Sequence, residues 1–279
     1  LVSGLCTVEP RSNTYRVLRV SRSAAAHAAP RESGAPVISR VQDILAYLPP
    51  PITQLLKSGG RSEGLEGEHR KVSVMFINVL ESDELLNERG PEGLLSELQQ
   101  YVSAVVRLAD QYGGFLVSND IYTQGLKLIL VFGAPVAHEQ DSANAFRLAL
   151  ALNRELPQLN VRLRHRIGIN SGFVFAGDVG AAYRREYTVM GDAVNLAARL
   201  MSAASPGQVL VSRQALQEAG PSFIASELAP IMVKGKQKPV PICTLEGERT
   251  VSLTRVADQE GAILGREAEL SLLRDLCDK

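Results

Sequence analysis

Residues 184–199 read RREYTVMGDAVNLAAR, and this stretch is the most informative part of the chain. Asp192 is a good N-cap for a helix over Ala193–Ala204, because its side chain can accept hydrogen bonds from first-turn N–H groups. Ala, Leu and Met dominate that segment and favour helical structure. Asn195 and Arg199 stand four residues apart, so they project from one face of the helix. An amide beside a guanidinium on an otherwise apolar helix suits a developing phosphate charge.

Hydrophobic patterning along the rest of the chain predicts an α+β fold built on one sheet. Apolar runs rich in β-branched residues predict strands, and apolar residues at helical spacing predict helices. The expected strands are 71–80, 115–121, 126–132, 161–170, 173–179 and 208–212, the expected helices are 94–112, 142–156 and 213–218, and a closing hairpin turns at residues 233–239. The order strand–helix–strand–strand–helix–strand is typical of a ferredoxin-like fold, with helices on one face of an antiparallel-rich sheet.

The run 184–199 resembles the signature of class III nucleotidyl cyclases, the enzymes that convert ATP into cyclic AMP. Within that family it is most similar to the second catalytic half of soluble adenylyl cyclases. The resemblance extends over residues 69–246 and implies the cyclase form of the ferredoxin-like fold. It implies that Asn195 orients the ribose and that Arg199 neutralises charge on the phosphorus under attack, which stabilises the transition state electrostatically. The alternative is that both side chains line a solvated stripe of the helix.

The same resemblance implies residues for the purine and the triphosphate. Family members of the soluble type recognise adenine with a Thr of the signature and a Lys of the first hairpin. Thr188 matches the Thr, whereas the Lys position falls at Ser118, which weakens adenine discrimination and leaves Asn119 and Asp120 as nearby substitutes. Lys234 and Lys236, in VKGK, match a family lysine that meets the triphosphate, or are ordinary solvated lysines of a turn.

Both positions at which the family holds its two metal ions depart from its pattern. The family places one Asp near the end of the opening strand and another after a Gly of the hairpin, and here these positions carry Asn78 and Leu126. A neutral amide and an aliphatic side chain cannot hold Mg²⁺, which prefers anionic oxygen ligands. We therefore expect no metal ligand in this domain. The ligands of Mg²⁺ or Mn²⁺ are expected to come from a first cyclase half in the same polypeptide. The domain alone is expected to be inactive with ATP.

Composition divides the chain into four regions. Residues 1–23 contain TYRVLRV, which is expected to be the last strand of an upstream cyclase half, and the Pro- and Gly-rich residues 24–68 are expected to be a linker. Residues 69–246 form the cyclase-like domain. Within 247–279, a linker leads to ILGREAELSLLRDL, which resembles the opening of an AAA-like or STAND signalling ATPase domain or is an ordinary helix. The first residue is Leu rather than Met, so we expect a piece of a longer protein.

Charge and cysteine content exclude several classes of function. The chain has 30 basic and 30 acidic residues, so it has no general attraction to nucleic acid or to an anionic membrane. No apolar run approaches the length needed to span a bilayer. Its 3 cysteines are odd in number and widely spaced, which favours a reducing compartment, expected to be the cytoplasm, over a disulfide framework or a zinc site.

Three alternatives to an adenylyl cyclase half follow from the sequence. A catalytically silent cyclase-like domain that regulates the downstream ATPase-like segment is favoured by the missing hairpin Lys, and is disfavoured by the retained Asn195 and Arg199. A guanylyl cyclase half would need an acidic residue facing the purine, and Thr188 argues against it. RNA binding by a ferredoxin-like sheet is set aside, because such sheets need aromatic residues and a basic face. This chain has few aromatic residues and no excess of positive charge.

Overall fold

The computed structural model describes residues 6–11, 14–20, 48, 52–53, 67–122, 125–159, 161–181, 184–233 and 238–249. The chain divides into two compact units, 1–58 and 59–279. In the first unit, β1 (Cys6–Arg11) pairs antiparallel with β2 (Thr14–Val20). The strand expected at TYRVLRV is therefore present as β2. The expected lysines Lys234 and Lys236 and the ATPase-like segment lie outside the described residues.

The second unit is built on an eight-stranded sheet in the order β4-β5-β3-β6-β8-β10-β9, with β7 paired to β6. All of its pairings are antiparallel except that of β6 with β8. The strands are β3 (Glu68–Leu80), β4 (Gly114–Tyr122), β5 (Gly125–Phe132), β6 (Arg164–Ala181), β7 (Arg184–Met190), β8 (Val209–Ser212), β9 (Phe223–Ile231) and β10 (Val240–Glu248).

The helices of the second unit connect these strands. They are α3 (Ser82–Tyr112), α4 (Asp141–Glu155), the short 3₁₀ helix η2 (Leu156–Gln158), α5 (Asp192–Ala203) and α6 (Arg213–Ala219). The mixed α+β fold with an antiparallel-rich sheet agrees with the expectation from the sequence. Within the described residues, no helix is long and apolar enough to cross a membrane.

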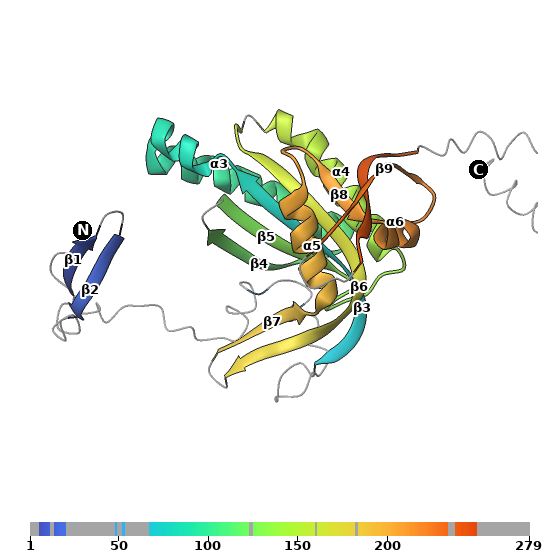
Figure 1. Cartoon of the computed structure of the whole chain (residues 1–279), viewed down its shortest axis with the longest axis horizontal. Coiled ribbons are helices and arrows are strands. Elements are labelled where there is room, and N and C mark those ends of the chain that lie inside the picture. The colour runs from blue at the N-terminus through green and yellow to red at the C-terminus, as the bar shows by residue number, and fades with distance from the viewer. Residues whose placement is uncertain are drawn as a thin grey trace, which may run out of the picture. The chain divides into compact units, whose positions relative to one another are not determined.

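Alternate residues of β3 divide the apolar core between the two faces of the sheet. Met75, Ile77 and Val79 pack with residues of α3 and α4, and we call this side the α3/α4 face. Val74 and Phe76 pack with residues of α5, and we call that side the α5 face. Figure 1 shows α5 crossing the sheet over β6 and β3. The two helices of the ferredoxin-like order, α3 and α4, therefore share one face as expected, whereas α5, which follows that order, packs on the opposite face.

Two expected elements differ from those observed. Helix α3 begins at Ser82 rather than near residue 94, and Gly90 (φ 71°, ψ −178°) followed by Pro91 breaks it into two helical pieces. The first piece is too polar for hydrophobic spacing to reveal it. The two strands expected around residues 171 and 172 form the single strand β6, because β3 pairs with it through this point without a break in register.

Candidate active site

Helix α5 presents a polar stripe that faces away from its own sheet. Asp192, Asn195, Arg199 and Ser202 recur at intervals of three and four residues, so they share one side of the helix. The other sides pack against the sheet through apolar residues, which are Ala193, Val194, Leu196, Ala197, Ala198, Leu200 and Met201. Asn195 is exposed and Arg199 is half-buried. The structure therefore brings the two predicted catalytic residues together on an accessible surface.

Close backbone contact fixes the position of α5 over β6. A Cβ atom on Gly168 would lie 2.1 Å from the backbone N of Met201 and 2.4 Å from the carbonyl oxygen of Ala197. Only glycine allows this approach. The buried amide of Asn170 also donates a hydrogen bond of 3.0 Å to the carbonyl of Ala193 in the first turn. Both residues belong to the run GINSG of β6, and together they orient the stripe.

The N-terminus of α5 differs from the expected capping arrangement. Gly191 is the N-cap residue, with φ 149° and ψ 175°, and no side chain caps the helix. Asp192, expected as the cap, is instead the first residue of the helix. There its negative charge interacts favourably with the positive end of the helix dipole. Gly191 also joins α5 directly to β7, so the signature run continues from a strand into the helix.

Thr188 lies on β7 opposite Gly177 of β6. Its neighbours Tyr187 and Val189 pack into the α5-face core, so alternation along the strand directs Thr188 to the other side. The ring of Tyr187 meets that of Phe115 on β4 edge to face at 5.9 Å, and burial raises the pKa of its phenol. This contact links the strand of Thr188 to the first hairpin, although within the described part of the chain no hydrogen bond joins Thr188 to Ser118.

Ser118 takes part in a small polar network on the β4–β5 hairpin. Its hydroxyl donates to Oδ2 of Asp120 at 3.0 Å, and Nζ of Lys127 lies 3.4 Å from the same oxygen. Asp120 and Lys127 are opposite each other in the antiparallel register. The hairpin thus carries a lysine near the position where the resemblance lacks one, on the neighbouring strand. Sequence reasoning missed Lys127 because only strand register places it beside Asp120.

The two expected metal positions do not converge. Asn78 is fully buried in β3, on the same face as Phe76 two residues earlier, which is the α5 face. Leu126 pairs with Val79, and both pack in the core of the α3/α4 face. Among the described residues, no group of three or more His, Cys, Asp or Glu side chains is placed to hold a metal ion. The residues at these positions therefore do not fit a divalent cation, in geometry or in ligand chemistry.

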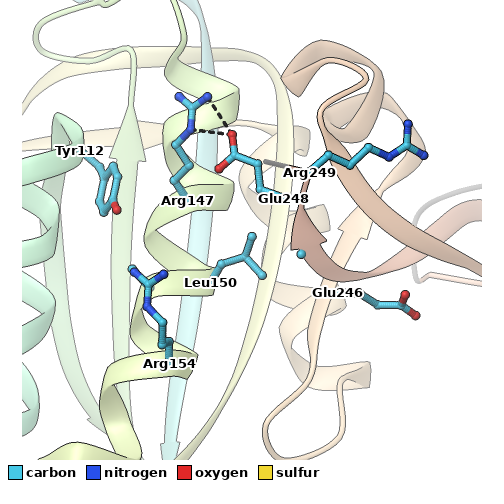
Figure 2. Close-up of a pocket in the computed structure, with 9 residues that line it drawn as sticks. Tyr112, Arg147, Leu150, Arg154, Glu246, Glu248 and Arg249 are labelled. Carbon is cyan, nitrogen blue, oxygen red and sulfur yellow. Dashed lines mark hydrogen bonds and ion pairs between the residues drawn. The ribbon is translucent and has the colours of Figure 1, made fainter. Parts of the chain in front are cut away.

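A pocket of about 560 Å³ lies away from the α5 stripe. It is lined by the end of α3, one side of α4 and the last residues of β10. Figure 2 shows Arg147 of α4 directed at Glu248, with which it forms an ion pair of 2.9 Å. Glu246 and Arg249 point away from α4 in the same view. None of the residues singled out in the sequence lines this pocket.

Comparison with known proteins finds relatives both among curated proteins and among solved structures. A protein of Mycobacterium tuberculosis, described as uncharacterized, is 38% identical over 161 residues, which cover 56% of this chain and 28% of that protein. A second uncharacterized protein of the same species is 33% identical over 209 residues, covering 72% of this chain and 35% of that protein. The chain thus spans about a third of the length of these curated relatives.

Solved structures agree with the fold. The adenylyl cyclase CyaB from P. aeruginosa matches with a TM-score of 0.60 and 28% identity, over 67% of this chain and 98% of that one. The guanylate cyclase domain of RhGC from Catenaria anguillulae, in complex with GTP, matches with a TM-score of 0.59 over 65% of this chain and 100% of that one. Its 22% identity shows the fold alone.

The match that decides the family covers the whole sheet and its helices. The family model of the adenylate and guanylate cyclase catalytic domain matches residues 66–246, from the start of β3 almost to the end of β10. These residues include the α5 stripe, the β4–β5 hairpin and Thr188. The chain belongs to the adenylate and guanylate cyclase catalytic domain family.

Proposed function

We propose that this domain is one half of a class III adenylyl cyclase site, the half that carries Asn195 and Arg199. The observation that carries the proposal is the outward position of both side chains on α5. Side chains that face away from their own sheet can enclose a nucleotide only if a second surface covers them. The chemistry of Asn78 and Leu126, neither of which can ligate Mg²⁺, supports a second half that differs from this one.

In the proposed reaction the ribose 3′ oxygen of ATP attacks the α-phosphorus. A bond forms between these atoms to give cyclic AMP, the bond from the α-phosphorus to the bridging oxygen breaks, pyrophosphate leaves with the bond electrons, and the proton of the 3′ hydroxyl passes to solvent water. Asn195 would hold the ribose, and the donors of Arg199 would stabilise the charge that develops at the α-phosphate. Mg²⁺ or Mn²⁺, bound by the first half, would neutralise triphosphate charge there.

The remaining predicted residues would bind the substrate without taking part in bond changes. Thr188 and Ser118 would contact the purine. Lys234 and Lys236 would meet the triphosphate. The first half is proposed to lie in the same polypeptide, upstream of this domain, with an ATPase-like domain downstream and the whole protein in the cytoplasm.

A reconstitution experiment tests the proposal. The chain is assayed for cyclic AMP formation from ATP and Mn²⁺, alone and mixed with a separately expressed cyclase half that carries both metal aspartates. Activity is expected only in the mixture and is expected to be lost with Arg199→Ala. The matched control is Arg213→Ala, because Arg213 begins α6 and pairs on the surface with Glu227. A mixture no more active than the added half alone, and indifferent to Arg199, would refute the proposal.

A catalytically silent regulatory domain is the second candidate. The absence of a lysine at Ser118 and of acidic side chains at Asn78 and Leu126 favours it. It predicts that the mixture shows no gain in activity while the chain still alters the output of an attached signalling domain.

Guanylyl specificity is the third candidate. An acidic group facing the purine would favour guanine, and Asp120 is the acidic residue of the hairpin. Its carboxylate is already engaged by Lys127 and Ser118, which weakens this alternative. Competition between ATP and GTP in the reconstituted mixture separates the two, since a guanylyl cyclase half would turn over GTP in preference.

A further inference from the structure

A row of polar residues crosses four neighbouring strands at the level of Asn78. Asp120 on β4 is opposite Lys127 on β5, Lys127 is opposite Asn78 on β3, and Asn78 is opposite Arg166 on β6. Directly opposed residues in an antiparallel sheet have Cβ atoms about 5 Å apart and point to the same face. Asn78, which stands at the family's first metal position, therefore has one cationic residue on each side, Lys127 and Arg166.

All members of the row lie on the α5 face. Phe76 and its partner Ile129 pack with α5; Asn78 lies two residues after Phe76, and Lys127 lies two residues before Ile129. Leu126 points to the other face, into the apolar core with Val79. The residue that faces Asn78 across the sheet is thus Lys127 and not Leu126.

The contacts of Lys127 are those of a bound cation. Its ammonium lies 3.4 Å from Oδ2 of Asp120, and the hydroxyl of Ser118 hydrogen-bonds to the same oxygen at 3.0 Å. The Lys127 side chain is 28% exposed and that of Asp120 is 52% exposed. Arg166, on the other side of Asn78, donates to the carbonyl of Ser202 at the end of α5. A divalent ion at this point would meet fixed positive charge from both directions.

We propose that Lys127 is the residue that excludes metal ions from this half of the site, since its strand position lies between those of Asp120 and Asn78 and its ammonium is held at Asp120. The inference rests on the proposed two-half function and extends it. On this proposal, the side chains at positions 78 and 126 are not the only obstacle to a metal ion in this domain. The lysine assigns the metal ions to the partner half, and two copies of this chain cannot make a productive pair.

Mn²⁺ titration of the purified chain tests this without nucleotide or partner. Free Mn²⁺ is followed by electron paramagnetic resonance for four variants: Asn78→Asp, Asn78→Asp with Leu126→Asp, Asn78→Asp with Lys127→Met, and Lys127→Met alone. Methionine keeps the length of the side chain and removes its charge. We expect Asn78→Asp with Lys127→Met to bind Mn²⁺ at least about tenfold more tightly than the other three variants. It alone combines carboxylates at positions 78 and 120 with the absence of the Lys127 ammonium.

Two results would overturn the inference. One is Mn²⁺ binding by Asn78→Asp, alone or with Leu126→Asp, while Lys127 is retained. The other is no binding by Asn78→Asp with Lys127→Met. If that variant is unstable in EDTA, its melting temperature is measured with added Mn²⁺; a rise supports the inference, since a ligand of the folded state stabilises it, and no rise overturns it. Cyclase activity plays no part in these readouts, so failure of the proposed function would be seen separately.

Discussion

The hydroxyl of Tyr101 lies 3.0 Å from Nδ1 of His165 in the core of the α3/α4 face. On the other side of the ring, Nε2 lies 2.6 Å from Oδ1 of Asn153. Nε2 carries the imidazole proton and donates it to Asn153, whose amide oxygen can only accept. Nδ1 therefore accepts from the hydroxyl of Tyr101, which keeps its proton because burial raises its pKa. A neutral histidine thus ties α3 and α4 to β6.

This network predicts loss of stability in mild acid. Burial lowers the pKa of His165 from 6.5 to about 4, so the unfolded chain takes up a proton that the folded protein does not. The contribution of neutral His165 to the free energy of unfolding is fully present above pH 6.5. It is lost progressively as the pH falls to 4, and the loss amounts to up to about 3 kcal/mol. Urea unfolding at several pH values in this range measures the loss.

The control for this prediction separates His165 from the carboxylates that also titrate in acid. His165→Gln should flatten the pH dependence between 6.5 and 5. Equal pH dependence in wild type and His165→Gln would contradict the assignment.

Gly168→Ala should destabilise the domain by about 3 kcal/mol or prevent α5 from docking. The new methyl group would meet the backbone of Met201 and Ala197 at 2.1 and 2.4 Å, and backbone atoms cannot move aside as a side chain end can. Thermal unfolding measures the effect. Gly247→Ala is the matched control, because the nearest atom to its added Cβ is 4.0 Å away, and it should change stability by less than about 0.5 kcal/mol. A tolerated Gly168→Ala would mean that α5 does not lie this close to β6.

Arg147 should contribute more to stability than its ion pair with Glu248 alone. Besides that pair (Figure 2), its guanidinium donates to Oε1 of Gln140 and Oδ1 of Asn144 and lies 5.9 Å from the ring centre of Phe223. We expect Arg147→Ala to cost about 1–2 kcal/mol and Glu248→Gln less than about 0.5 kcal/mol, since partly exposed ion pairs contribute little. Chemical unfolding of both variants measures the difference, and equal losses would mean that the ion pair alone accounts for it.

Asn195→Ala should separate activity from stability. The side chain is exposed on the outward stripe of α5, so its removal should change the free energy of unfolding by less than about 0.5 kcal/mol. In the reconstituted mixture with a metal-binding half, the same variant should lower kcat by about 10²-fold, the loss typical of one transition-state hydrogen bond. Parallel unfolding and kinetic measurements decide it. A large loss of stability would instead assign Asn195 a structural part in the helix.

Local patterns in the sequence determined most elements and the polar pair on α5. The spacing of Asn195 and Arg199 and the helix formers around them fix a common face, because a helix of this composition has one geometry wherever it packs. The strands β3, β5 and β8 could be read from their apolar runs for the same reason. The polar first piece of α3 could not, since it forms against the rest of the fold rather than by an apolar stripe of its own.

Relations between strands were decided only by the tertiary structure. Asn78 and Leu126 look equivalent in sequence, as two lost metal ligands, yet register and pleat send them to opposite faces of the sheet. The same register places Lys127 across from Asn78 and beside Asp120, a meeting of three strands that no local pattern contains. Residue spacing along one chain segment sets which side chains share a helix face. Pairing between distant segments depends instead on the free energy of the whole core, and it decides which side chains surround the candidate site.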